Sequence, residues 1–160
     1  AITRQGGTGT DSRSPAQPAD TPGRFETGTP NYPGIASLLA GIRFIQSTGI
    51  DAIRQKEMAL TRQFIRLLKR TRGITLYNND PDLPVVAFNI SGIDNEEAGF
   101  ILAKAYNVIT RTGLHCAPLV HERIDGGKGC IRASFSYFNT PEQVEAAAAA
   151  VREVAAGADR

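Results

Sequence analysis

Arg111-Thr-Gly-Leu-His-Cys-Ala-Pro-Leu119 is the stretch around which the rest of the chain is organised. It follows the β-prone run 107–110 and carries Cys116, flanked by a histidine and an arginine, in a loop that contains a glycine and a proline. A second arginine, Arg132, lies downstream in an apolar run. Because burying an unpaired guanidinium is expensive, Arg132 predicts an anion nearby. The sequence therefore predicts a thiol and two cations near one pocket.

Composition limits the classes of protein to consider. The 160 residues are enough for one domain with a buried core, and the net charge of +2 is too small to indicate nucleic-acid binding. Two cysteines in this length do not make a disulfide framework, so we expect reduced thiols and a cytoplasmic location. No apolar run approaches the roughly 20 residues of a membrane helix. Residues 1–31 also lack the apolar centre of a signal peptide.

The opening segment differs from the rest of the chain. We expect residues 1–33 to form an extended loop and residues 34–160 to form the folded domain. The many prolines of this segment oppose regular structure. Its glycine-rich run 6–10 lacks the Gly-Lys-Ser/Thr ending of a phosphate-binding loop, so a connector is the better interpretation. A loop this long is unusual inside a domain, which suggests a segment that crosses another surface.

Two helices are expected next, from 33 to 48 and from 51 to 72. Pro33 suits the first turn of the first helix, and Gly49 suits its end. In both segments apolar residues recur at the spacing of one helix face. Basic residues near the end of the second helix favour a solvated surface that complements the helix dipole.

The second half of the chain predicts a sheet and two further helices. Strands are expected near 74–77, 85–90, 107–110 and 130–135. Asp94 and Thr140 each stand three residues before a Glu or Gln, which makes a capping box at the start of a helix. Short strands with helices on one face predict a two-layer α/β sandwich with a small, mostly antiparallel sheet.

The two cysteines have different expected roles. Cys116 is a candidate nucleophile, because His115 and Arg111 can stabilise a thiolate; the alternative is a structural thiol. Cys130 has no polar helper in its apolar strand and is expected in the core. His121 fits either the surface or the rim of a pocket.

The ligand types of a zinc site are present in His115, Cys116, His121 and Cys130. However, no Cys-x-x-Cys or His-x₃-His pair occurs, and ligands adjacent in sequence are awkward for one tetrahedral ion. The sequence therefore predicts no metal site.

Three segments resemble one family, in order and in spacing. Residues 111–119 resemble the active-site cysteine loop of cysteine desulfurases of the selenocysteine-lyase-like group, which belong to the class V aminotransferase family of fold-type I pyridoxal-phosphate enzymes. Residues 24–31 are similar to the phosphate-contacting segment of that family, and residues 131–140 to the segment that holds the substrate carboxylate. The resemblance runs from about Gly6 to Val154.

The resemblance covers the C-terminal part of such an enzyme. It implies that 34–160 is the small domain and that 1–33 packs on the large domain and on the partner subunit of a homodimer. The family carries its cofactor-binding lysine upstream of the first matching segment. None of the four lysines here suits that role: Lys56, Lys69, Lys104 and Lys128. We therefore expect the cofactor to be held mainly by a missing N-terminal part, and the fragment to be inactive by itself.

The resemblance also implies a reaction. Cys116 would take sulfur from L-cysteine as a persulfide, releasing L-alanine, and pass it to a sulfur acceptor protein in iron–sulfur cluster assembly. Arg132 would hold the substrate carboxylate, and Arg111 would add positive potential near the thiol. Gly28 and Thr29 would contact the phosphate of pyridoxal phosphate.

Two alternatives to this function stay open at the level of sequence. The fragment could be a non-catalytic interaction module that kept the fold and lost the chemistry. It could also belong to a class V lyase that acts on selenocysteine or on another amino acid. Cys116 favours sulfur or selenium but does not distinguish them further.

Overall fold

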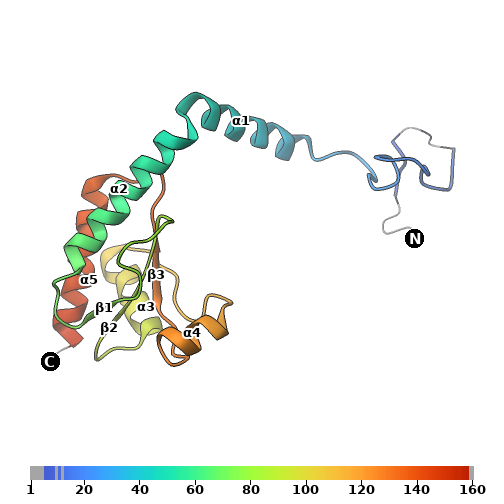
Figure 1. The fold of residues 1–160 in the computed structure, drawn as a ribbon. Helices are drawn as coiled ribbons and strands as arrows, with labels where there is room; N and C mark the ends of the chain where they lie inside the picture. The colour runs from blue at the N-terminus through green and yellow to red at the C-terminus, as the bar shows by residue number, and fades with distance from the viewer. Residues whose placement is uncertain (1–5, 10, 12, 159–160) are drawn as a thin grey trace. The chain divides into compact units, whose positions relative to one another are not determined.

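The computed structural model describes residues 6–9, 11 and 13–158, which form two compact units (Figure 1). The first unit is Ala1–Thr48 and the second is Gly49–Arg160. The division therefore falls after the first helix, whereas the sequence placed it at residue 33. The physical reason is that this helix buries none of its residues, so it does not join the core of the second unit. Within the described part of the chain, no helix is long and apolar enough to cross a membrane.

The first unit consists of bends and turns followed by α1 (Tyr32–Thr48). The predicted helix 33–48 is thus confirmed to within one residue. Its apolar residues recur along one face but remain 43–65% exposed: Ile35, Leu38, Leu39, Ile42 and Ile45. This helix therefore presents an apolar surface that no other described residue buries.

The second unit is built on a three-stranded antiparallel sheet in the order β1-β2-β3. Its strands are β1 (Ile74–Leu76), β2 (Val85–Ile90) and β3 (Ile131–Ser134). The strand predicted at 107–110 is wrong, because this segment meets β3 only through a single bridge between Arg111 and Arg132. The chain leaves the preceding helix through Asn107, whose φ of 55° is incompatible with extended backbone.

Three helices pack against this sheet: α2 (Ile50–Leu68), α3 (Asn95–Tyr106) and α5 (Pro141–Ala158). Both predicted capping residues are confirmed. The Asp94 carboxylate accepts hydrogen bonds from the first turn of α3. Thr140 and Gln143 exchange reciprocal hydrogen bonds of 3.3 and 3.2 Å at the start of α5.

The core lies between the helices and one face of the sheet. Alternate residues of β2 are buried there, and Phe88 contacts Phe64 of α2 with 5.9 Å between ring centroids. Phe135 adds a third ring 5.2 Å from Phe64. The result is the predicted α/β fold with a small antiparallel sheet.

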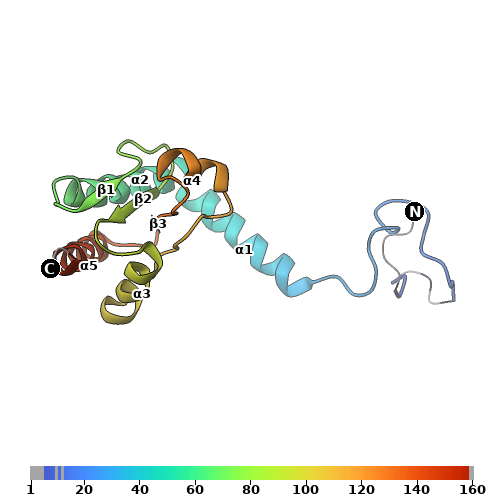
Figure 2. The same cartoon turned by 90° about the horizontal axis from the view of Figure 1, so that it is seen from below.

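One further helix, α4 (Pro118–Ile124), was not predicted. The polar, glycine-rich residues 122–129, which overlap its end, favour a mobile segment on sequence alone. Pro118 nevertheless suits its first turn, and burial of His121 (3% exposed) fixes it on the domain. Figure 2 shows α4 and α3 on opposite sides of β3.

Candidate active site

The cysteine loop 111–117 is anchored at its base by Asn95, the first residue of α3. The side-chain oxygen of Asn95 accepts a hydrogen bond of 2.8 Å from the Gly113 N–H. Its amide nitrogen donates to the Lys128 carbonyl at 3.1 Å. Asn95 is only 7% exposed, so both hydrogen bonds are shielded from water. One side chain thus joins the cysteine loop to the glycine-rich segment before β3.

Two glycines allow the loop to approach its neighbours. A Cβ at Gly99 of α3 would lie 2.3 Å from the Thr112 methyl group. A Cβ at Gly129 would lie 2.7 Å from the backbone of Gly113, and the Cys130 N–H donates to the Gly113 carbonyl at 3.1 Å. The loop therefore lies in close contact with the backbone of α3 on one side and with the segment before β3 on the other.

The tip of the loop holds two non-glycine residues in the left-handed region. His115 has a φ of 52° and Cys116 a φ of 60°. Such conformations are uncommon for residues with a Cβ, and they cluster at functional sites. Here they send neighbouring side chains in different directions: Cys116 is exposed, whereas the ring of His115 turns inward to Cys130.

Arg111 and Arg132 stand directly opposite each other. The Arg111 N–H donates to the Arg132 carbonyl at 3.1 Å, and the Arg132 N–H donates to the Arg111 carbonyl at 2.7 Å. Residues opposed in this way direct their side chains to the same face. The Arg111 guanidinium also donates to the Cys116 sulfur at 3.5 Å. The structure thus brings together both predicted arginines and the predicted thiol.

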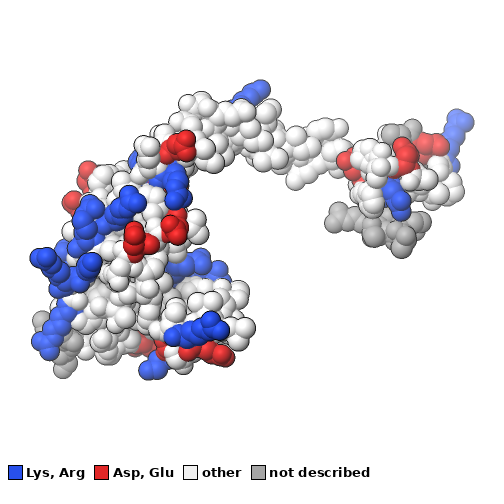
Figure 3. All heavy atoms as spheres, in the orientation of Figure 1, with Lys and Arg blue, Asp and Glu red and all other residues white. Residues whose placement is uncertain are grey.

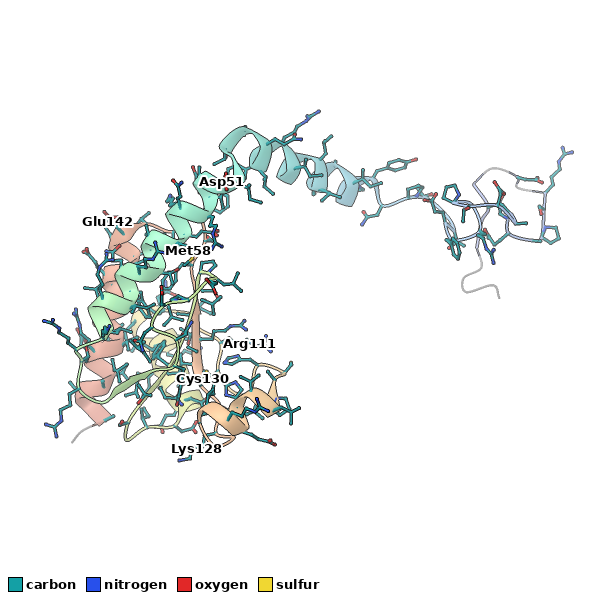
Figure 4. All side chains as sticks on the ribbon, in the orientation of Figure 1. Asp51, Met58, Arg111, Lys128, Cys130 and Glu142 are labelled. Atoms are coloured by element: carbon teal, nitrogen blue, oxygen red, sulfur yellow. The ribbon has the colours of Figure 1, made fainter. Side chains whose placement is uncertain are left out.

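The electrostatics of this pair favour an anion. Like charges directly opposite each other are destabilising. The Arg132 Nε is also buried without a hydrogen-bond partner among the described residues, which is costly for a charged group. A carboxylate placed between the two guanidinium groups would pair with both and weaken their repulsion, in a bidentate geometry that suits arginine. Figure 4 shows Arg111 beside Cys130 on the same side of the second unit.

The two histidines form a second polar cluster beneath the loop. The ring centroids of His115 and His121 lie 5.5 Å apart, and His115 Nε2 is 3.0 Å from the Cys130 carbonyl oxygen. Burial lowers the pKa of His115, and the nearby charges of Arg132 and Arg111 lower it further. His115 is therefore neutral at pH 7. It does not add the positive charge beside the thiol that the sequence had led us to expect.

Asp125 is a buried group that the sequence did not single out. Its carboxylate lies 2.5 Å from His121 Nδ1, and both side chains are under 5% exposed. Burial acts to raise the pKa of Asp125, but hydrogen bonds from His121 and from backbone N–H groups outweigh it and lower that pKa. The available signal was the four-residue spacing of His121 and Asp125, which brings side chains together across one helical turn.

Cys130 occupies the core, as predicted. It is 1% exposed, and burial raises the pKa of its thiol to about 11, with the Asp125 charge adding to the shift. At neutral pH Cys130 is therefore a protonated thiol and a poor nucleophile.

The predicted phosphate contacts lie in the first unit. The Gly28 N–H donates to the Gly7 carbonyl at 2.8 Å, so the structure does not offer it to a phosphate. Thr29 is exposed. All four lysines are also exposed, and Lys56 lies over the Tyr137 ring at 4.5 Å. Of the two predicted phosphate contacts, the Thr29 hydroxyl is therefore exposed, whereas the Gly28 N–H is already engaged.

Comparison with known proteins identifies the class. The sequence pattern of the aminotransferase class-V family matches residues 4–147, and the chain belongs to this family. The cysteine desulfurase of Salmonella agona is 39% identical over 128 residues, which are 79% of this chain and 31% of that protein.

Solved structures of cysteine desulfurases share the fold. The apo enzyme of Thermococcus onnurineus gives a TM-score of 0.75 at 33% identity, covering 85% of this chain and 34% of its own. The enzyme CsdA of Escherichia coli, in its S-sulfonic acid form, gives 0.74 at 27% identity, covering 85% of this chain and 33% of its own. The chain thus spans about a third of the length of the relatives it matches.

Proposed function

We propose that this chain is the part of a pyridoxal-phosphate-dependent cysteine desulfurase that holds the substrate carboxylate and accepts its sulfur. The observation that carries the proposal is the opposed pair Arg111 and Arg132, with the exposed Cys116 sulfur 3.5 Å from the Arg111 guanidinium. Two opposed cations beside a thiol suit an amino acid that carries both a carboxylate and a sulfur.

The arginines orient the substrate. Arg132 binds the carboxylate of L-cysteine through its buried Nε, which has no hydrogen-bond partner among the described residues. This contact fixes the direction of the substrate side chain and presents its sulfur to Cys116, which converts a bimolecular encounter into an oriented one. Arg111 stabilises negative charge at the Cys116 sulfur, since its guanidinium is the cation in contact with that atom.

Cys116 then acts as the nucleophile. Its thiolate forms a bond to the substrate sulfur, the carbon–sulfur bond breaks, and the electron pair of that bond stays with carbon, which takes up a proton as L-alanine forms. Pyridoxal phosphate, when bound, supplies the electron sink that stabilises negative charge on the substrate carbon. The sulfur remains on Cys116 as a persulfide.

The cofactor would be held largely by groups outside this chain. Within it, the exposed Thr29 hydroxyl would contact the phosphate, and all four lysines are exposed on the surface. We therefore propose that the 160 residues alone release no sulfide. We also propose a homodimer and a cytoplasmic location, in line with the family resemblance.

An acceptor protein completes the proposed function. Because Cys116 is exposed at the tip of its loop, a second thiol can reach the persulfide sulfur directly. The acceptor would carry this sulfur into sulfur metabolism, including the assembly of iron–sulfur clusters.

The test uses the whole protein loaded with pyridoxal phosphate and supplied with L-cysteine. Cys116→Ala should lose sulfide and alanine release while the cofactor absorbance is kept, since the thiol acts after the substrate has bound. Arg132→Ala should chiefly raise KM. The lost binding free energy should be about 2–5 kcal/mol if the carboxylate pairing is buried. Arg66→Ala, on the exposed face of α2, is the matched control and should leave both constants unchanged.

Two results would contradict the proposal. Wild-type sulfide output from Cys116→Ala would exclude the persulfide and leave a lyase as the better assignment. A whole protein that binds the cofactor but turns over neither L-cysteine nor selenocysteine would favour the interaction module.

A further inference from the structure

Three metal-binding side chains converge beneath the cysteine loop, from three separate elements. His115 comes from the loop, His121 from α4, and Cys130 directly precedes β3. One nitrogen of each ring and the Cys130 sulfur all lie within 4.8 Å of one another. Both His121 and Cys130 are buried, and His115 is half-buried.

The spacing suits a tetrahedral ion. His115 Nε2 lies 3.6 Å from the Cys130 sulfur. A zinc ion bound at about 2.0 Å by nitrogen and about 2.3 Å by sulfur would separate these two atoms by about 3.5 Å. The other two ligand pairs lie within 4.8 Å of each other. To bind the ion, the His115 Nε2 must give up its 3.0 Å contact with the Cys130 carbonyl oxygen. Two imidazoles and a thiolate are also the ligand types that zinc prefers.

The surroundings of His121 resemble the support of a metal ligand. The Asp125 carboxylate lies 2.5 Å from His121 Nδ1, so Nε2 is the ring nitrogen of His121 that can face a metal. Asp125 in turn accepts a hydrogen bond of 3.0 Å from the Lys128 N–H, so its position is fixed as well. A carboxylate bound to the far nitrogen of a histidine orients the ring and raises its basicity toward a metal.

We propose that His115, His121 and Cys130 bind one zinc ion, with the fourth tetrahedral position taken by water. The ion would fasten the cysteine loop to α4 and to the start of β3. Cys116 is not a ligand, because its sulfur contacts Arg111 and it does not belong to the converging group. This proposal departs from the expectation of no metal, because the fold brings together ligands that are far apart in the sequence. It does not depend on the proposed function.

The first experiment measures metal binding by the tag-free 160-residue chain after treatment with a chelator. Cobalt(II) chloride should bind at one equivalent with a thiolate-to-cobalt charge-transfer band, and zinc chloride should displace it. Cys130→Ser should abolish the band, and Asp125→Asn should weaken zinc affinity about 10- to 100-fold. Cys116→Ser is the matched control and should keep both the band and the stoichiometry.

Two outcomes would overturn the proposal: no charge-transfer band in the wild-type chain, or a band that is lost in Cys116→Ser and kept in Cys130→Ser. Circular dichroism of each variant checks that it folds. If Cys130→Ser does not fold, X-ray absorption at the zinc edge of the wild-type chain takes its place. One sulfur and two imidazoles around zinc support the site, whereas a shell without sulfur refutes it.

Discussion

At the scale of single residues, Cys116 and Cys130 should differ strongly in reactivity. Cys116 is exposed beside a guanidinium, whereas Cys130 is buried and its pKa is raised to about 11. In the metal-free chain, iodoacetamide should therefore modify Cys116 faster, by roughly tenfold or more. Peptide mass spectrometry over a time course measures both rates. Equal rates would remove the case for Cys116 as the reactive thiol.

Loss of Asn95 should release the base of the loop. Asn95→Ala leaves the Gly113 N–H and the Lys128 carbonyl without their partner, which should cost about 1–3 kcal/mol of unfolding free energy. Asn79→Ala, at an exposed turn, is the matched control and should have little effect. Denaturant unfolding of both variants gives the comparison. Equal stabilities would show that the two loops do not depend on this side chain.

Residue roles could be predicted from sequence where local chemistry determines them. An apolar strand without polar neighbours placed Cys130 in the core, and the structure confirms this. The direction of His115 could not be predicted, because it depends on two successive left-handed residues. Asp125 was missed because its importance comes from burial against His121, a tertiary property that charge alone does not reveal.

At the scale of elements, the contact between α3 and the cysteine loop depends on Gly99. Gly99→Ala would place a methyl group 2.3 Å from that of Thr112, so helix and loop must separate. This overpacking should cost about 1–3 kcal/mol. Gly157→Ala in α5 meets nothing within 4 Å and should be neutral or stabilising by up to about 1 kcal/mol. Thermal unfolding of the pair separates the two effects, and a stabilised Gly99→Ala would contradict the packing described.

Elements were predictable where a local signal sets their ends. The capping boxes at Asp94 and Thr140 located the starts of α3 and α5, because the hydrogen bonds involved lie within four residues. The predicted strand at 107–110 failed, since a strand needs a partner and only one bridge forms. Helix α4 was missed because its sequence carries no apolar stripe that faces the core: of its residues only His121 is buried.

At the scale of the whole molecule, the second unit should fold without the first. Its core runs from Leu60 to Ala155, and none of the described residues of the first unit belongs to it. A chain of residues 49–160 should therefore show the same thermal midpoint as the 160-residue chain by circular dichroism. A markedly lower midpoint would show that the first unit contributes to the core.

The charged surface of the second unit is uneven. Figure 3 shows Lys and Arg gathered over the C-terminal half of α2. The exposed residues concerned lie in the second half of α2 and just after its end: Arg62, Arg66, Lys69, Arg70 and Arg72. The sequence predicted this surface, since a helix with a buried stripe turns its charged residues to solvent. The signal for the apolar face of α1 was equally clear, but its spacing alone does not reveal what covers it.

The opposed arginines make the empty loop respond to ionic strength in an unusual direction. Dissolved salt weakens most ion pairs, which are attractive. Between Arg111 and Arg132 it instead screens a repulsion, across a bridge that only two backbone hydrogen bonds hold together. The substrate-free loop should therefore be less tightly closed in dilute buffer than at physiological salt. Hydrogen exchange at the Arg111 and Arg132 amides would slow as salt is added, even as ordinary surface pairs weaken.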